Sequence, residues 1–288
     1  MRGGRPSIGL FPWALAFGLF GLFPLVYALI LSFQQMNPLR PDLTHFVGVE
    51  NYVRALRSTS FWHALRTTVF FVVGTIPVTL TLAYVVAMLL SRIRRAQGFF
   101  RAAIFFPATV SMVVIALVFK SLYAEEGLLN GWLTSVGLAR VHWLQDVRTA
   151  LPSIMLMDIW GSVGYYAILI LAGRNTLPAE QLEAARLEGL SRWQVERRIV
   201  FPHLRPVLLF VVLLNTIRSF QIFTEVFVLT RGGPLESTLT LVYHLYERAF
   251  YHFEMGYASA IAYLLLALVG VVLLIQRRVL GARAEQAA

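Results

Sequence analysis

Six apolar runs, each close to the length of a membrane-crossing helix, constrain what this chain can fold into more than any other feature. The runs cover residues 10–33, 67–90, 102–119, 150–172, 207–230 and 257–276. An α-helix needs about 20 apolar residues to cross the hydrocarbon layer of a bilayer. The runs lack the alternating pattern of a membrane barrel, so their backbone hydrogen bonds have to form inside helices. The sequence therefore predicts an all-α polytopic membrane protein, with residues 1–288 forming one transmembrane domain of six spans.

The composition narrows the possible chemistry. Hydrophobic residues make up 58% of the chain and charged residues 14%, which is too apolar for a water-soluble domain of this size. The absence of cysteine excludes disulfides, thiolate catalysis and cysteine–zinc sites. The six histidines do not have the His-x-x-His or His-Glu-x-x-His spacing of metal ligands. We therefore expect no metal and no cofactor in this chain.

The arginines predict the orientation in the membrane, because cytoplasmic loops retain positive charge. Segments 1–9, 91–101, 173–206 and 277–288 hold 15 Lys and Arg residues in 66 positions, whereas segments 34–66, 120–149 and 231–256 hold 9 in 89. Both termini are therefore expected on the cytoplasmic side of a cell inner or plasma membrane, with the first span retained as an uncleaved anchor. The net charge of +10 does not indicate nucleic-acid binding, since the arginines flank the spans.

The segment 173–206 is a polar insert between two spans. Pro178 and the early acids Glu180 and Glu183 favour a helix start, and Gly189 favours a helix end with a positive φ. Ser191-Arg-Trp-Gln194 resembles a capping box and predicts a second short helix that stops near Pro202. A helix lying on the lipid surface is the alternative, but such a helix would be mostly basic, whereas this insert has mixed charge. A soluble partner that docks on the insert is the better interpretation.

Three separated motifs carry a family resemblance. The insert matches a Glu-Ala-Ala, Gly, Ile-x-x-Pro pattern at Glu183, Ala184, Ala185, Gly189, Ile199 and Pro202. A second match runs from Leu229-Thr230 through Gly232-Gly233-Pro234 to Phe250, and a third from Leu22 to Tyr52. The chain resembles the permease subunits of binding-protein-dependent ABC importers, in the carbohydrate and glycerol-3-phosphate group. Phe201 stands where the family usually has leucine and Glu188 where aspartate is common, and both changes keep size or charge.

The resemblance implies a type I importer fold and a set of partners. Two ATP-binding cassette ATPase subunits would dock at the Glu-Ala-Ala loops of the importer and carry ATP and Mg²⁺, so this chain would be a transporter subunit and not an enzyme. A second, homologous permease would complete a heterodimer, and an extracytoplasmic binding protein would deliver a sugar or a related polyol or glycerol phosphate. Independently of the resemblance, a phosphate-binding Gly-x-x-x-x-Gly-Lys loop is missing, because the only lysine, Lys120, follows Phe119.

Four polar residues of the fifth apolar run form a predicted stripe. Asn215, Arg218, Gln221 and Glu225 fall within about 120° on one continuous helix at 100° per residue. Such residues inside a bilayer face a cavity or a partner, so we interpret them as a solute path, with a polar network against the second permease or snorkelling as alternatives. Arg218 and Glu225 are two helical turns apart, so each is expected to have a separate partner. Asp158 and Trp160 in the fourth run are weaker candidates.

Two other function classes are compatible with parts of the sequence. An ion-coupled secondary transporter could move protons through Asp158, Arg218 and Glu225, but it would need no ATP and would leave the 173–206 insert unexplained. A membrane enzyme or scaffold has less support, because the spans hold no nucleophile–base pair and no metal-ligand set.

Overall fold

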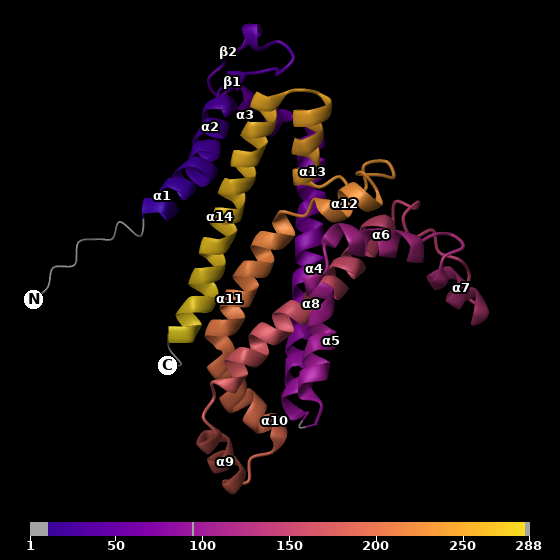
Figure 1. Ribbon diagram of the computed structural model, residues 1–288, viewed down its shortest axis with the longest axis vertical. Coiled ribbons are helices and arrows are strands. Elements are labelled where there is room, and N and C mark those ends of the chain that lie inside the picture. The colour runs from indigo at the N-terminus through magenta and orange to yellow at the C-terminus, as the bar shows by residue number, and fades with distance from the viewer. Residues whose placement is uncertain (1–10, 94, 286–288) are drawn as a thin grey trace, which may run out of the picture. The chain divides into compact units, whose positions relative to one another are not determined.

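The computed structural model describes residues 11–93 and 95–285. Its backbone contacts divide the chain into two compact units. Among the described residues, unit 1 comprises 11–62 and 244–267, and unit 2 comprises 63–93, 95–243 and 268–285. The elements of each unit are labelled in Figure 1.

The described residues contain five helical stretches that are long and apolar enough to cross a membrane. These stretches are Phe11–Ser32, Thr59–Arg92, Ala150–Asn175, Arg192–Leu229 and Met255–Val279. A sixth candidate is a bent pair, Gln97–Thr109 and Met112–Leu122, whose arms meet at 93°. The prediction of an all-α polytopic protein is confirmed, and the third and fifth runs differ from the simple spans that were expected.

Unit 1 is built around the first candidate span. This span consists of α1 (Phe11–Phe17), the π-helical turn η2 (Gly18–Leu22) and α2 (Phe23–Ser32). After α2 come the paired strands β1 (Gln34–Gln35) and β2 (His45–Phe46), with the 3-10 turn η3 (Pro41–Leu43) between them, and then α3 (Glu50–Arg57). The π-helical turn η5 (Glu247–Tyr251) and the first part of α14 (Met255–Glu285) complete the unit.

A buried asparagine secures the α2–α3 connection of unit 1. Nδ2 of Asn51 donates hydrogen bonds to the carbonyl oxygens of Ser32 and Gln34, each at 2.9 Å. A Cβ at position 256 would overlap the carbonyl oxygen of Gln34, so only glycine allows α14 to approach this close to β1. Asn51 belongs to the N-terminal motif noted above, and its role in the fold is to close a loop.

Unit 2 is organised around α8 (Ala150–Asn175), which carries the largest set of buried residues in the described chain. Helices α5 (Gln97–Thr109), α6 (Met112–Leu122), α11 (Phe201–Phe220) and α12 (Thr224–Leu229) pack against it. The remaining helices wholly or partly in the unit are α4 (Thr59–Arg92), α7 (Leu128–Ser135), α9 (Ala179–Leu187), α10 (Arg192–Val195), the π-helical turn η4 (Glu196–Val200), α13 (Leu241–Tyr246) and the second part of α14. A core that includes Tyr166, Ile170 and Leu204 lies where α8 meets α11.

The third apolar run, residues 102–119, is not one helix. Val110 and Ser111 have extended backbones, with ψ of 142° and 134°, and they separate α5 from α6. Pro107 lies inside the last turn of α5 and lacks the amide that would bond the carbonyl of residue 103, which weakens the helix just before the break. Close packing on α8 contributes as well. A Cβ at position 164 would overlap the carbonyl oxygen of Ile104 on α5, and one at position 161 would touch Met112 on α6. Gly164 thus lets α5 pack tightly on α8, whereas a Cβ at position 161 would meet α6 at ordinary contact distance.

The fifth apolar run differs from the prediction at both ends. The second short helix of the insert was expected to stop near Pro202. Instead, α10, η4 and α11 follow one another without a break from Arg192 to Phe220. The amide of Phe201 bonds the carbonyl of Glu196 in a wide π-helical turn, which places Pro202 in the first turn of α11, where a missing amide costs nothing. At the other end, residues 221–223 interrupt the run before α12.

The packing of α5 on α8 predicts opposite effects for the same substitution at two glycines. Gly164→Ala should lower the melting temperature of the detergent-solubilised protein, since its Cβ must displace backbone, an overpacking cost of about 1–3 kcal/mol. Gly98→Ala on α5, where the Cβ meets open space, should leave the melting temperature equal or higher, because alanine favours a helix. Equal melting curves for both variants would contradict the close approach.

Candidate solute pathway and coupling loop

Arg218 lies at the centre of a cluster of three charged residues in unit 2. Its Nη2 atom is 2.8 Å from Oδ1 of Asp158 and 3.5 Å from Oε1 of Glu225. The three residues come from different helices: Asp158 from the middle of α8, Arg218 from the last turn of α11, and Glu225 from the first turn of α12. Asp158 and Glu225 are almost fully buried, and the Arg218 side chain is 36% exposed.

The cluster corrects the expectation of separate partners for Arg218 and Glu225. On a continuous helix these residues would be two turns apart, but the interruption at residues 221–223 brings the Glu225 carboxylate close to the guanidinium. Asp158 was the weaker candidate, yet it makes the shorter ion pair. The sequence contained one signal for this ion pair. An acid and an arginine lie in neighbouring apolar runs, and a charge at membrane depth needs a partner.

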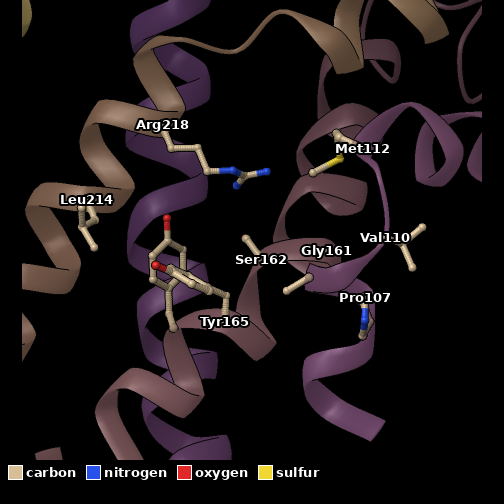
Figure 2. Close-up of a pocket in the computed structure, with 10 residues that line it drawn as sticks. Pro107, Val110, Met112, Gly161, Ser162, Tyr165, Leu214 and Arg218 are labelled. Atoms are coloured by element: carbon tan, nitrogen blue, oxygen red, sulfur yellow. The ribbon is translucent and has the colours of Figure 1, made fainter. Parts of the chain in front are cut away.

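A cavity of about 370 Å³ opens beside Arg218. It is lined by Pro107, Ala108, Val110, Met112, Gly161, Ser162, Tyr165, Tyr166, Leu214 and Arg218. Figure 2 shows the Arg218 side chain reaching from α11 across the cavity, with Ser162 and Tyr165 from α8 on another side of it. The bend between α5 and α6 supplies the opposite wall through Pro107, Val110 and Met112. The break in the third run therefore forms part of the cavity wall.

A second hollow of about 360 Å³ shares Arg218 with the first. Its lining includes Gln221, Thr224 and Glu225, which lie in and after the interruption of the fifth run. Arg218, Gln221 and Glu225, three of the four predicted path residues, thus line hollows, although they do not form one helical stripe. Asn215 lines neither hollow: it is buried at 1% exposure and accepts a hydrogen bond from Ser219.

The loop that precedes α11 has the local geometry predicted from its sequence. Helix α9 is followed by Gly189, whose φ is +75°, and no atom outside the adjacent residues lies within 4 Å of a Cβ built there. The Ser191 hydroxyl accepts from the amide of Gln194, and the Gln194 side chain accepts from the amide of Ser191, which is a complete capping box. The positive φ and the capping box are confirmed. In Figure 1 these helices lie at the end of unit 2 where α8 finishes and α11 begins.

Some motif residues of this loop are buried or packed against unit 2, and others are exposed to solvent. Ala185 is 3% exposed, and Ile199 packs against the core of unit 2, while Glu183 and Ala184 are exposed. Pro202 is partly buried in the first turn of α11. Two large apolar side chains outside the motif, Leu187 at 90% and Trp193 at 72%, are also exposed beside it. Motif reasoning missed these two residues, since only their exposure distinguishes them from core residues.

Glu196 joins the loop to a neighbouring helix. Its carboxylate accepts a 2.6 Å hydrogen bond from the Tyr84 hydroxyl on α4. Thr176, after the end of α8, makes a 3.0 Å hydrogen bond with His203 in the first turn of α11. These two hydrogen bonds join η4 to α4, and the residue after α8 to the first turn of α11.

Comparison with known proteins identifies the family. Residues 76–286 match the family described as the inner membrane component of binding-protein-dependent transport systems. The chain belongs to this family. It is 36% identical to the probable ABC transporter permease protein YurN of Bacillus subtilis (strain 168), covering 89% of each chain. It is 33% identical to the lactose transport system permease protein LacF of Rhizobium radiobacter, covering 89% of this chain and 87% of the relative.

Another relative and a solved structure agree with this assignment. The chain is 32% identical to the arabinooligosaccharides transport system permease protein AraP of Bacillus subtilis (strain 168), over 96% of this chain and 88% of the relative. It superimposes with a TM-score of 0.84 on a chain of a bacterial ABC transporter involved in the import of the acidic polysaccharide alginate, over 95% and 93% of the two chains at 19% identity. The fold expected from the family resemblance, that of an importer permease, is confirmed.

The charge cluster predicts a large effect for loss of its arginine. Arg218→Ala leaves two buried carboxylates unpaired, and we expect a loss of about 3 kcal/mol, the low end for a buried pair because the arginine is partly exposed. The melting temperature of the detergent-solubilised protein measures this loss. Arg140→Ala, at an exposed arginine, is the control and should have almost no effect. A triple variant that also carries Asp158→Asn and Glu225→Gln should recover much of the loss, and failure to do so would contradict the ion-pair account.

Proposed function

We propose that this family member forms the translocation path for a saccharide in an ATP-driven importer. The observation that carries the proposal is the cavity beside Arg218, which lies between helices of the candidate spans and is lined by both hydroxyl and apolar side chains. Tyr165 and Ser162 present hydroxyl groups, and Pro107, Val110 and Met112 present apolar surface, a combination suited to the hydroxyls and C–H faces of a sugar ring. The names of LacF and AraP, which refer to lactose and arabinooligosaccharides, support the same solute class.

The proposed coupling runs through one uninterrupted helical segment. Helix α10 belongs to the exposed loop, and it continues through η4 into α11, which ends two residues after Arg218. A partner that shifts the loop would therefore shift the wall of the cavity with it. Closure and opening of two ATP-binding cassette subunits, one of them bound here at Glu183, Ala184 and Gly189, would bias the permease pair between two states of access. ATP and Mg²⁺ would stay on those subunits, because this chain lacks a phosphate-binding loop.

The assembly that we propose has further members. A second, homologous permease would complete the path as a heterodimer, and an extracytoplasmic binding protein would deliver the solute. The arginine-rich segments 91–101 and 173–206 support placing this loop, and with it both termini, on the cytoplasmic side. Nothing in the proposal involves a nucleic acid.

An ion-coupled transporter remains the second candidate, because the two buried carboxylates beside Arg218 could also carry protons. The two candidates differ in their energy source. In proteoliposomes that contain the permease pair, the ATPase subunits and the binding protein, lactose and arabinotriose are suitable labelled probes. ATP-dependent uptake of either probe supports the importer. Uptake driven by a proton gradient without ATP would support the alternative.

The positive φ of Gly189 predicts which substitutions are tolerated in the coupling loop, as we call the segment 173–206. Gly189→Val should abolish ATPase association and uptake, because a β-branched residue at φ +75° is strained even though space is available. Gly189→Asn is the matched control and should retain most of both, since asparagine adopts this conformation more readily. Co-purification of the ATPase with each variant measures docking. Wild-type docking by Gly189→Val, with the protein normally present in the membrane, would contradict the role of the loop.

A further inference from the structure

We propose that the Asp158–Arg218–Glu225 cluster restricts the pathway to uncharged saccharides and rejects those that carry carboxylate or phosphate groups. The inference rests on the proposed function, because it concerns the solute of the same cavity. The names of the similar proteins leave this property open, since they include both lactose and the acidic polysaccharide alginate. The charges around the cavity distinguish the two classes.

The charge count around Arg218 does not favour an anion. Arg218 is the one charged residue among the described residues that line the first cavity, and Arg218 and Glu225 are the two in the second. Taken alone, the arginine would attract an acidic solute. However, its guanidinium contacts the carboxylates of both Asp158 and Glu225, so the cluster has two acids for one base. An incoming carboxylate or phosphate would have to displace a fixed carboxylate or accept repulsion from it where water screening is weak.

The same geometry suits a hydroxyl group. Both ion pairs of Arg218 use Nη2, yet its side chain is still 36% exposed and lines both hollows. A sugar hydroxyl oxygen would accept from the accessible part of the guanidinium without adding charge. Figure 2 shows that the guanidinium extends into the cavity, where Met112 and Val110 provide apolar surface for the rest of the ring.

Removing the charge of Glu225 should change the selectivity between neutral and acidic saccharides with the least disturbance of the cluster. It makes the longer contact with Arg218, 3.5 Å against 2.8 Å for Asp158, and it lines the second hollow directly. Glu225→Gln keeps the size of the side chain and leaves Arg218 paired with Asp158 alone, so the cluster has one acid for one base. An acidic solute then no longer meets a surplus carboxylate. Asp158→Asn tests the same charge change from the other helix.

Galactose and galacturonate form a matched probe pair, because they differ in whether C6 carries a hydroxyl or a carboxylate. We would measure saturation-transfer NMR on the permease pair with its ATPase subunits in nanodiscs, without the binding protein, so that only the permease selects. The wild-type complex should bind galactose, and its affinity for galacturonate should be lower by about tenfold or more. Glu225→Gln and Asp158→Asn should each narrow this difference. Glu236→Gln, which removes an exposed carboxylate from outside both hollows, should leave the difference unchanged.

The outcomes separate the inference from the proposed function. Galacturonate bound as well as galactose by the wild type, or a preference unchanged in both cluster variants that assemble, would overturn the charge-based selection while leaving a saccharide path in place. Binding of neither probe to an assembled wild-type complex would overturn the saccharide path at this cavity, and the inference with it. Reduced discrimination in either cluster variant, with the control unchanged, supports the assignment.

Discussion

An arginine placed among membrane-crossing helices has to be paired, and Arg218 is paired with carboxylates from two other helices. This requirement explains several features at once. The interruption at residues 221–223 allows α12 to present Glu225 to the end of α11, and α8 presents Asp158 from its buried centre. The ion pairs thus connect α8, α11 and α12 beside the cavity. A wholly apolar cluster would pack the same helices but would offer a solute no hydrogen-bond donor from the guanidinium that lines the cavity.

The second constraint is close packing on α8. Gly164 lets α5 approach its backbone, and the bend between α5 and α6 forms one wall of the cavity. The opposite wall belongs to α11, which continues without a break from the exposed loop that holds Gly189 and the capping box. One wall is therefore held by tight packing on α8, and the other is attached to the surface where a partner would dock. This asymmetry suits a transporter that has to move one side of its path relative to the other.

Structural features that depend on neighbouring residues could be predicted from the sequence, whereas features that depend on residues far apart in the chain could not. The apolar runs, the capping box at Ser191 and Gln194 and the positive φ of Gly189 were predictable, since each follows from neighbouring residues. The breaks after Thr109 and Phe220 were not, although Pro107 lies close to the first: the helices that flank them pack on α8 and α6, and such long-range contacts cannot be read from neighbouring residues. The pairing of Asp158 with Arg218 was missed for the same reason: 60 positions separate the two residues, and a helical wheel of one run contains only one of them. Continuation of the helix past Pro202 was mispredicted because the π-helical turn η4 accommodates the proline.

The central claim is that α10, η4 and α11 transmit motion from the coupling loop to Arg218 as one body. The chain contains no cysteine, so spin labels can be attached at Trp193 on α10, Phe210 on α11 and Phe99 on α5, which are all exposed. Pulsed electron resonance on the assembled importer, with and without ATP trapped by vanadate, gives the distances between label pairs. The account predicts that the 193–210 distance stays constant while the 193–99 and 210–99 distances change together. A change between 193 and 210 with 210–99 unchanged would mean that the helix bends at η4, and it would contradict the account.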